Sequence, residues 1–191
     1  MPRAGLTPVR VVAEAEVVAD AVGLDRLTLA AVAGRLGVRI PSLYKHVDGI
    51  DGLRREIAVR AKTELGQAMA RAAVGKARED ALTALAHAYR RWAKAYPGRY
   101  AATIRAPAPG DVDDEVASAT AVQVVYDVLA GFGLSGVDAV DATRALRATL
   151  HGFVALESAG GFGLPVDVDR SFDRVVDGLV TAMSHWGSMA A

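Results

Sequence analysis

The sequence predicts an all-α protein with two parts, a three-helix N-terminal domain over residues 1–50 and a larger helical bundle over residues 51–191. Apolar residues recur at the spacing of an α-helix in almost every segment, whereas the alternation typical of strands is absent. Residues 1–62 hold ten Lys and Arg against seven Asp and Glu, a net charge of +3, while residues 63–191 hold twelve against fifteen, a net charge of −3. A weakly basic N-terminal part followed by an acidic C-terminal part is consistent with a small domain that binds a polyanion and a larger one that does not.

The composition excludes several classes of protein. Of the 191 residues, 52% are hydrophobic and 23% are charged, which excludes a disordered chain and a collagen. Because the chain has no cysteine, disulfides, thiolate catalysis and cysteine-ligated zinc are excluded, and no cofactor or metal site is predicted. The N-terminus lacks the apolar core of a signal peptide, and no apolar run approaches the roughly 18 residues of a membrane helix. We therefore expect a soluble cytoplasmic protein.

The first helix is predicted from Thr7 and Pro8 to Gly23. A threonine hydroxyl can cap a helix, and the missing N–H of proline costs nothing at the first helical position. One face of this helix carries the apolar side chains Val11, Ala15, Val18, Ala19 and Val22.

Two shorter helices are predicted next, and a tight turn joins them. The first starts at Thr28 and stops at Gly37, and the second begins near Ile40 and Pro41. The apolar residues that we expect to face the core are Leu29, Val32, Ala33 and Leu36 in the first helix, and Leu43 and Val47 in the second. Asp48-Gly49 interrupts the helical pattern. A long helix then follows from about Asp51, and it is expected to bury Leu53, Ile57, Ala61 and Leu65.

Four further helices are predicted over about residues 78–96, 113–132, 138–159 and 168–186. The helix over residues 78–96 has an aromatic and apolar stripe, and its opposite, solvated face is expected to carry His87, Arg90, Arg91 and Lys94. Pro97-Gly98 ends this helix, and the acidic run from Asp113 to Glu115 favours a new helix start because it complements the helix dipole.

The segment from Thr28 to Val47 is the most informative part of the sequence. Two short helices joined by a glycine-containing turn form a helix-turn-helix, in which the second helix enters the major groove of DNA. If Leu43 and Val47 hold the second helix to the core, its outward side chains are Ser42, Lys45 and His46. The alternative interpretation of these polar residues is a solvated helix face without a ligand.

The same segment resembles the TetR/AcrR family of one-component regulators. The match is carried by residues 28–38, with the sequence TLAAVAGRLGV, and by residues 41–47, with the sequence PSLYKHV. In the second half, Leu150-His151-Gly152-Phe153 and Gly160-Gly161-Phe162 resemble, more loosely, the C-terminal domain variant that is named for a Trp-His-Gly motif.

The resemblance implies a set of DNA-contacting residues. Thr28 and Tyr44 would bind the backbone, His46 would add a phosphate contact, and Lys45 would address guanine. The predicted DNA-binding residues are Thr28, Arg39, Pro41, Ser42, Tyr44, Lys45 and His46. Many relatives have a phosphate-clamping lysine where this chain has Ile50, and some have a base-reading arginine where it has Ala30, so we expect a shallow salt dependence.

The resemblance also implies an effector pocket and a dimer interface in the C-terminal bundle. The residues predicted to line the pocket are Tyr89, Trp92, Tyr96, Tyr100, Tyr126 and His151, although aromatic residues at this spacing are also typical of a plain core. The helices near residues 138–159 and 168–186 are predicted to form a two-fold interface, because small residues recur at heptad spacing at Ala145, Ala148, Gly152, Ala155 and Ala159.

The sequence therefore predicts a homodimeric transcriptional regulator, most consistent with a repressor that an unidentified small molecule releases from a pseudo-palindromic operator. The first alternative is a helical ligand-binding or partner-docking protein that has lost specific DNA binding. The second is a small α-helical enzyme that uses His151 and Glu157, but no nucleophile or substrate site accompanies this pair, so we predict that the protein is not an enzyme.

Overall fold

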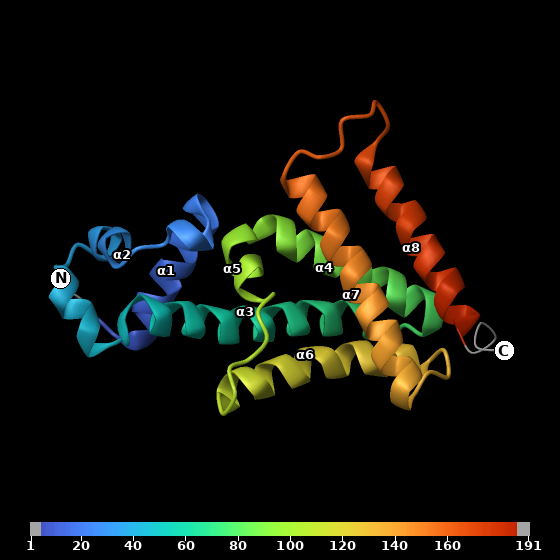
Figure 1. Cartoon of the computed structure of the whole chain (residues 1–191), viewed down its shortest axis with the longest axis horizontal. Helices are drawn as coiled ribbons and strands as arrows, with labels where there is room; N and C mark the ends of the chain where they lie inside the picture. The colour runs from blue at the N-terminus through green and yellow to red at the C-terminus, as the bar shows by residue number, and fades with distance from the viewer. Residues whose placement is uncertain (1–4, 187–191) are drawn as a thin grey trace. The chain divides into compact units, whose positions relative to one another are not determined.

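The computed structural model describes residues 5–186, and every regular element in this range is a helix (Figure 1). The chain divides into two compact units. The head unit consists of the residues up to Thr63 together with Ala95–Ser118, and the bundle unit consists of Glu64–Lys94 and the chain from Ala119 onward. Within residues 5–186 no helix combines the length and the apolar character that crossing a bilayer requires.

All eight predicted helical segments are present in the predicted order, together with two short helical elements that were not predicted. The elements are α1 (Pro8–Val22), η1 (Leu24–Arg26), α2 (Leu29–Leu36), η2 (Ile40–Lys45), α3 (Gly49–Ala73), α4 (Arg78–Ala95), α5 (Pro97–Ala102), α6 (Val112–Ala130), α7 (Gly136–Ser158) and α8 (Val168–Ser184). Both η elements are 3₁₀ helices. The first parts of α3 and α6 belong to the head unit, and their second parts belong to the bundle unit.

The start of α1 follows from its sequence. The Thr7 hydroxyl oxygen accepts a hydrogen bond from the Arg10 backbone N–H at 3.3 Å, and Pro8 occupies the first helical position. Four of the five apolar residues predicted to face the core from α1 are buried. Val22 is instead 37% exposed, because α1 ends at this residue and the chain turns away at Gly23.

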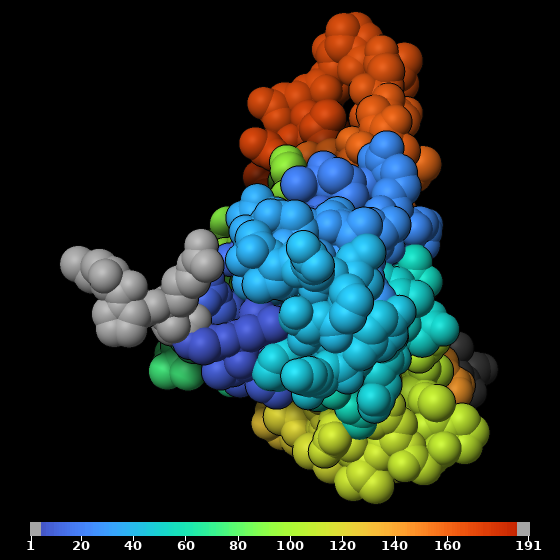
Figure 2. Space-filling model, turned by 90° about the vertical axis from the view of Figure 1, so that its left-hand side faces the viewer, coloured from blue at the N-terminus to red at the C-terminus, as the bar shows by residue number. Residues whose placement is uncertain are grey.

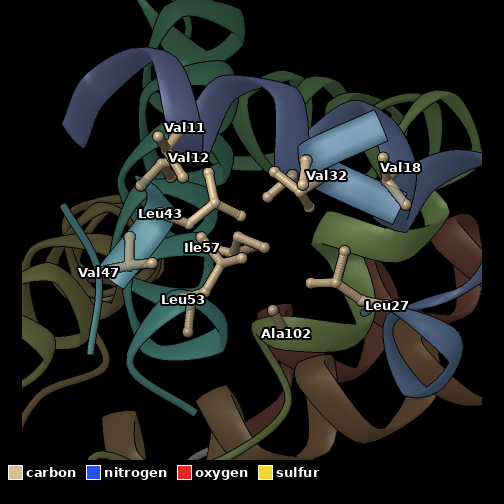
Figure 3. Packing of buried hydrophobic residues seen from close by; sticks show 13 residues of the cluster. Val11, Val12, Val18, Leu27, Val32, Leu43, Val47, Leu53, Ile57 and Ala102 are labelled. Carbon is tan, nitrogen blue, oxygen red and sulfur yellow. The ribbon is translucent and has the colours of Figure 1, made fainter. Parts of the chain in front are cut away.

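The core of the head unit collects side chains from α1, α2, η2, α3 and α5, as Figure 3 shows. Leu43 of η2 is fully buried and lies among Val11, Leu53 and Ile57. Burial of a leucine side chain contributes about 1.5–3 kcal/mol. The core therefore holds η2 in place.

The segment after α4 differs from the prediction. Pro97-Gly98 does end α4, but Pro97 is also the first residue of the short helix α5, which packs against α1. Gly98 is buried, and a Cβ atom at this position would overlap the Ala19 carbonyl group, so only glycine permits this approach. Asp20 receives hydrogen bonds from the backbone N–H and the Nε of Arg99, at 2.9 and 2.8 Å.

The acidic start of α6 is held to α3 by ion pairs within the head unit. Arg55 donates from Nε to Asp111 at 2.6 Å and from a terminal nitrogen to Asp113 at 2.9 Å. The hydrogen bonds from Arg55 lower the pKa of the Asp111 carboxyl group. Next to this pair, the buried side chains of Lys62 and Asp114 meet at 2.5 Å. The head unit is thus larger than the predicted domain over residues 1–50, since it extends along α3 and includes α5 and the start of α6.

The bundle unit corrects one prediction about α4. Arg90 was expected on the solvated face but is only 7% exposed, because its guanidinium group donates to Glu157 of α7 at 2.8 and 2.7 Å and to Asp169 of α8 at 2.7 Å. The guanidinium carbon also lies 4.7 Å from the ring centre of Phe172. Helices α7 and α8 form an antiparallel hairpin, whose connecting loop is at the top of Figure 1.

Candidate nucleic-acid interface

Helix α2 is capped at both ends, and its C-terminal cap leads into the turn before η2. The Thr28 hydroxyl oxygen accepts a hydrogen bond from the Ala31 backbone N–H at 3.2 Å, as the predicted cap requires. Gly37 ends the helix in the left-handed region with φ 66° and ψ 32°, which a residue with a side chain adopts only at a cost. The Val38 N–H then donates to the Ala33 carbonyl at 3.0 Å, which closes the turn.

The second helix of the motif is a 3₁₀ helix, which periodicity at α-helical spacing did not predict. It opens with a hydrogen bond from the Ser42 N–H to the Arg39 carbonyl at 2.9 Å, and it closes with bonds from the His46 and Val47 N–H groups to the Leu43 carbonyl. In a 3₁₀ helix, side chains three residues apart lie above one another. Within η2 this geometry pairs Pro41 with Tyr44, Ser42 with Lys45, and Ile40 with Leu43.

These side chains differ in exposure. The buried side chains of Leu43 and Val47 face the core, as predicted. Pro41, Tyr44 and Lys45 are exposed, with Tyr44 at 60%, and Ser42 is half-buried. Figure 2 looks onto this surface, where the light-blue and cyan atoms of α2 and η2 face the viewer. The exposed side chains of Pro41, Tyr44 and Lys45 therefore lie on the accessible surface of η2, and the exposed Arg39 directly precedes this helix. Thr28 is also exposed, at the opposite end of α2 from the turn.

His46 directly follows η2 as its C-cap residue. It is half-buried, as Ser42 is, and its predicted contact with DNA stays a prediction. It lines a hollow of about 460 Å³ together with Pro8 and Val9 of α1 and Gly52 of α3.

Two ion pairs brace the helices behind the interface. Arg35 of α2 donates to Glu14 of α1 at 2.9 Å, and Arg60 of α3 lies 2.9 Å from the buried Glu16 carboxylate of α1. Neither pair could be predicted from the sequence, because the partners are separated by 21 and 44 positions and no local pattern links them.

Ile50 has a structural role at the start of α3. It stands where many relatives have a phosphate-clamping lysine, and here it is half-buried and packs against the head-unit core. Helix α3 begins at Gly49, two residues before the predicted start. The neighbouring Asp48 and Asp51 are exposed, so the electrostatic potential at this end of the interface is not strongly positive.

Comparisons with known proteins agree with this geometry. Residues 82–179 match the family described as "Tetracyclin repressor-like, C-terminal domain". The chain is 40% identical over 168 residues to Rv0681 of Mycobacterium tuberculosis, an uncharacterised HTH-type transcriptional regulator, and the match covers 87% of this chain and 76% of that protein. The chain belongs to the TetR family of transcriptional regulators.

A second relative supports this assignment, and a solved structure has the same fold. The TetR-family chain is 37% identical to YobS of Bacillus subtilis, another uncharacterised HTH-type transcriptional regulator, over 89% of this chain and 88% of that protein. A crystal structure of a TetR variant from Acinetobacter baumannii in complex with minocycline has the same fold, with a TM-score of 0.71 and 22% identity over 95% of this chain and 98% of that chain. The protein is therefore a DNA-binding regulator, and the alternative that has lost DNA binding is not favoured.

The six residues predicted to line an effector pocket in this TetR-family regulator do not all belong to one unit. Tyr96 and Tyr100 lie in the head unit, and the other four lie in the bundle unit. Tyr89, Trp92 and Tyr100 are buried, whereas Tyr96, Tyr126 and His151 are half-buried. The Arg99 guanidinium group stacks 3.7 Å from the ring centre of Tyr96. Their role in ligand binding stays a prediction, as does the Trp-His-Gly variant of the C-terminal domain.

Glu157, which the enzyme alternative paired with His151, has a different role. Its carboxylate accepts hydrogen bonds from Arg90 and, at 2.6 Å, from Lys94. These hydrogen bonds, chiefly the ones from Arg90, lower the pKa of Glu157 to about 2. A carboxylate held ionised in this way is a poor general acid or base near neutral pH.

Proposed function

We propose that this TetR-family regulator is a repressor that binds a pseudo-palindromic operator as a homodimer and is released by a small-molecule effector. In this proposal each subunit inserts the exposed edge of η2 into the major groove, and the two insertions are separated by about 34–36 Å along the DNA. Because such a regulator acts where the DNA is, we also propose a cytoplasmic location.

One observation supports these DNA contacts most directly. Leu43 and Val47 attach η2 to the core from behind, while Tyr44 and Lys45 stay exposed on the other side. We assign Lys45 and Ser42 to base edges, and Tyr44 and Thr28 to the phosphate backbone. A lysine that addresses guanine contributes about 1–3 kcal/mol of discrimination, whereas a phosphate contact strengthens binding to every sequence equally.

The test compares Lys45→Ala with Arg71→Ala, since Arg71 is an exposed cation near the end of α3, far along the sequence from η2. We expect Lys45→Ala to weaken binding to the chain's own upstream DNA about 5- to 150-fold, with a much smaller loss on competitor DNA, and Arg71→Ala to change neither. The measurement is fluorescence anisotropy at fixed salt. If Lys45→Ala loses the same affinity for both DNAs, Lys45 contacts phosphate and not a base edge. If the wild type does not prefer the upstream DNA, that DNA does not contain the operator.

For the dimer, we propose an interface made by α7 and α8. The small residues of the α7 stripe leave room for a second helix, since Ala148, Ala155 and Ala159 are exposed and Ala145 is half-buried. A Cβ atom added to Gly152 would meet no atom within 4 Å in the single chain. Close approach of α-helices along such a stripe is typical of helical dimer interfaces.

For the effector, we propose a flat or apolar molecule bound in the bundle unit. The proposal rests on the aromatic character of the predicted pocket residues in that unit, Tyr89, Trp92 and Tyr126. Minocycline in the structurally similar TetR is a precedent for a small-molecule ligand in this fold. Trp186→Phe leaves Trp92 as the only tryptophan of the chain. A planar effector that releases operator DNA should quench Trp92 fluorescence in this variant. Release without any change in Trp92 emission would place the effector elsewhere.

A further inference from the structure

A second hollow lies in the bundle unit, near the turn that joins α3 to α4. Its volume is about 340 Å³, which is at the lower end of the range for small-molecule sites. Small side chains from the end of α3 and the start of α4 form one wall, and two valines of α6 form the other. The apolar residues that line the hollow are Ala70, Ala73, Val74, Ala77, Ala81, Val124 and Val128.

Close helix contacts lie next to this hollow on both sides along α6. On one side, a Cβ atom added to Gly66 of α3 would lie 3.1–3.2 Å from the Cα and Cβ atoms of Ala121. On the other side, a Cβ atom added to Gly131 would lie 3.4 Å from the Arg78 backbone nitrogen. The space between these contacts therefore results from the small size of the alanine side chains and not from loose packing of the helices.

Two cations lie at this hollow without a charged partner. Lys76 and Arg78 both line it, and within residues 5–186 neither side chain forms an ion pair, whereas Arg55, Lys62 and Arg90 are all paired with carboxylates. The single acidic residue in the lining, Asp127, accepts a hydrogen bond from Gln123 at 2.8 Å. The lining thus carries two positive charges and one negative charge.

The backbone of Arg78 is also unusual. Its φ of 48° makes it the only non-glycine residue with positive φ among the described residues. Such a conformation costs about 1–2 kcal/mol in a residue with a side chain. Its guanidinium carbon lies 5.8 Å from the ring centre of Phe132, just beyond the end of α6. Backbone outliers of this kind concentrate at binding sites.

We infer that this hollow binds an aliphatic monocarboxylate, with its tail against the alanine and valine walls and its carboxylate on Lys76 and Arg78. The apolar lining favours an aliphatic tail, because moving such a tail from water onto an apolar surface lowers the free energy. The net charge of +1 in the lining matches one anionic group, and a guanidinium group can donate two parallel hydrogen bonds to a carboxylate. This site is independent of the aromatic residues that the proposed function assigns to the effector.

The test is isothermal titration calorimetry of the full chain with octanoate, together with octanol and octylammonium as uncharged and cationic controls of equal chain length. The wild type should bind octanoate saturably, octanol more weakly, and octylammonium not at all. The double variant Lys76→Gln/Arg78→Asn removes both charges, and asparagine tolerates the left-handed backbone of position 78. It should weaken octanoate binding at least about tenfold, because each bond to a charged group contributes to affinity.

Two more variants test whether octanoate binds in this hollow or elsewhere on the protein. Ala77→Leu places a larger side chain in the hollow and should also weaken binding, while it keeps both cations. Arg71→Gln removes an exposed charge of α3 that does not line the hollow, and it should leave octanoate binding unchanged. Methyl NMR spectra should show octanoate-dependent shifts for Ala77 and Val128. The inference is wrong if octanoate does not bind saturably, if octylammonium binds equally well, or if the double variant and Ala77→Leu both retain wild-type affinity.

Discussion

Replacing Asp114 by asparagine should destabilise the protein strongly, although position 114 belongs to no proposed binding site. In the native head unit, the Lys62 ammonium and Asp114 carboxylate groups are 2.5 Å apart, and their side chains are only 6% and 3% exposed. At an effective dielectric constant of ~20, two unit charges at this distance attract each other by about 7 kcal/mol. Most of this attraction offsets the cost of removing both charges from water.

The expected loss of stability comes from the Lys62 charge, which remains buried after the substitution. Without the Asp114 carboxylate, Lys62 stays buried without an opposite charge, and breaking a buried pair in this way costs about 3–5 kcal/mol. For a chain of this size such a loss lowers the thermal midpoint by about 6–20 °C. It is also a large fraction of a typical total stability of about 5–15 kcal/mol.

The assay is urea unfolding followed by circular dichroism, for Asp114→Asn and for two comparison variants. Asp141→Asn breaks an ion pair with Arg144, in which the Asp141 side chain is 53% exposed and the Arg144 side chain is 76% exposed. This change should alter the free energy of unfolding by less than about 1 kcal/mol. The double variant Lys62→Met/Asp114→Leu removes both charges and should recover most of the stability. If Asp114→Asn loses no more stability than Asp141→Asn, the buried pair does not stabilise the head unit as argued.

Three further predictions concern other parts of the molecule. Gly98→Ala should destabilise the protein by about 1–3 kcal/mol in urea, because the added Cβ overlaps the Ala19 carbonyl, and an unchanged midpoint would show that α1 and α5 can separate freely. Glu157 has a pKa of about 2 in the folded protein, so its contribution to stability is complete above its ordinary pKa of 4.5 and is lost as the pH falls towards 2. Unfolding measured between pH 2 and pH 7 should accordingly show a weaker acid dependence for Glu157→Gln than for the wild type, and identical pH profiles would contradict the assignment of this carboxylate. Gly152→Leu should shift the sedimentation coefficient from dimer towards monomer, since it places a bulky side chain in the α7 stripe, whereas an unaltered dimer would count against the proposed interface.

Much of the head unit could be predicted from sequence because its signals are local. The Thr7 and Thr28 caps, the stop at Gly37 and the inward Leu43 all depend on residues within a few positions of one another. The motif over residues 28–47 was specific enough to indicate the family, which the comparisons then confirmed.

The predictions failed where the answer depended on a distant partner. Arg90 was placed in solvent because it lies beside Arg91 and Lys94 in sequence, yet it is buried by carboxylates 67 and 79 positions away. Gly98 was interpreted only as a helix stop, although its place against α1 requires the absence of a side chain. Periodicity did not distinguish the 3₁₀ helix η2 from a short α-helix either, because six residues contain less than two turns of an α-helix and only two turns of a 3₁₀ helix.

The sequence by itself determined the eight main helical segments, the Thr7 and Thr28 caps, the helix-turn-helix and the family, because hydrogen bonds within a helix and amphipathic spacing act over a few residues. Only the tertiary structure decided which charges are buried and paired, that α5 joins the head unit, and that Lys76 and Arg78 lie unpaired beside an alanine-lined hollow. The physical reason is that the free energy of a charge or a small side chain depends on what the folded chain brings next to it.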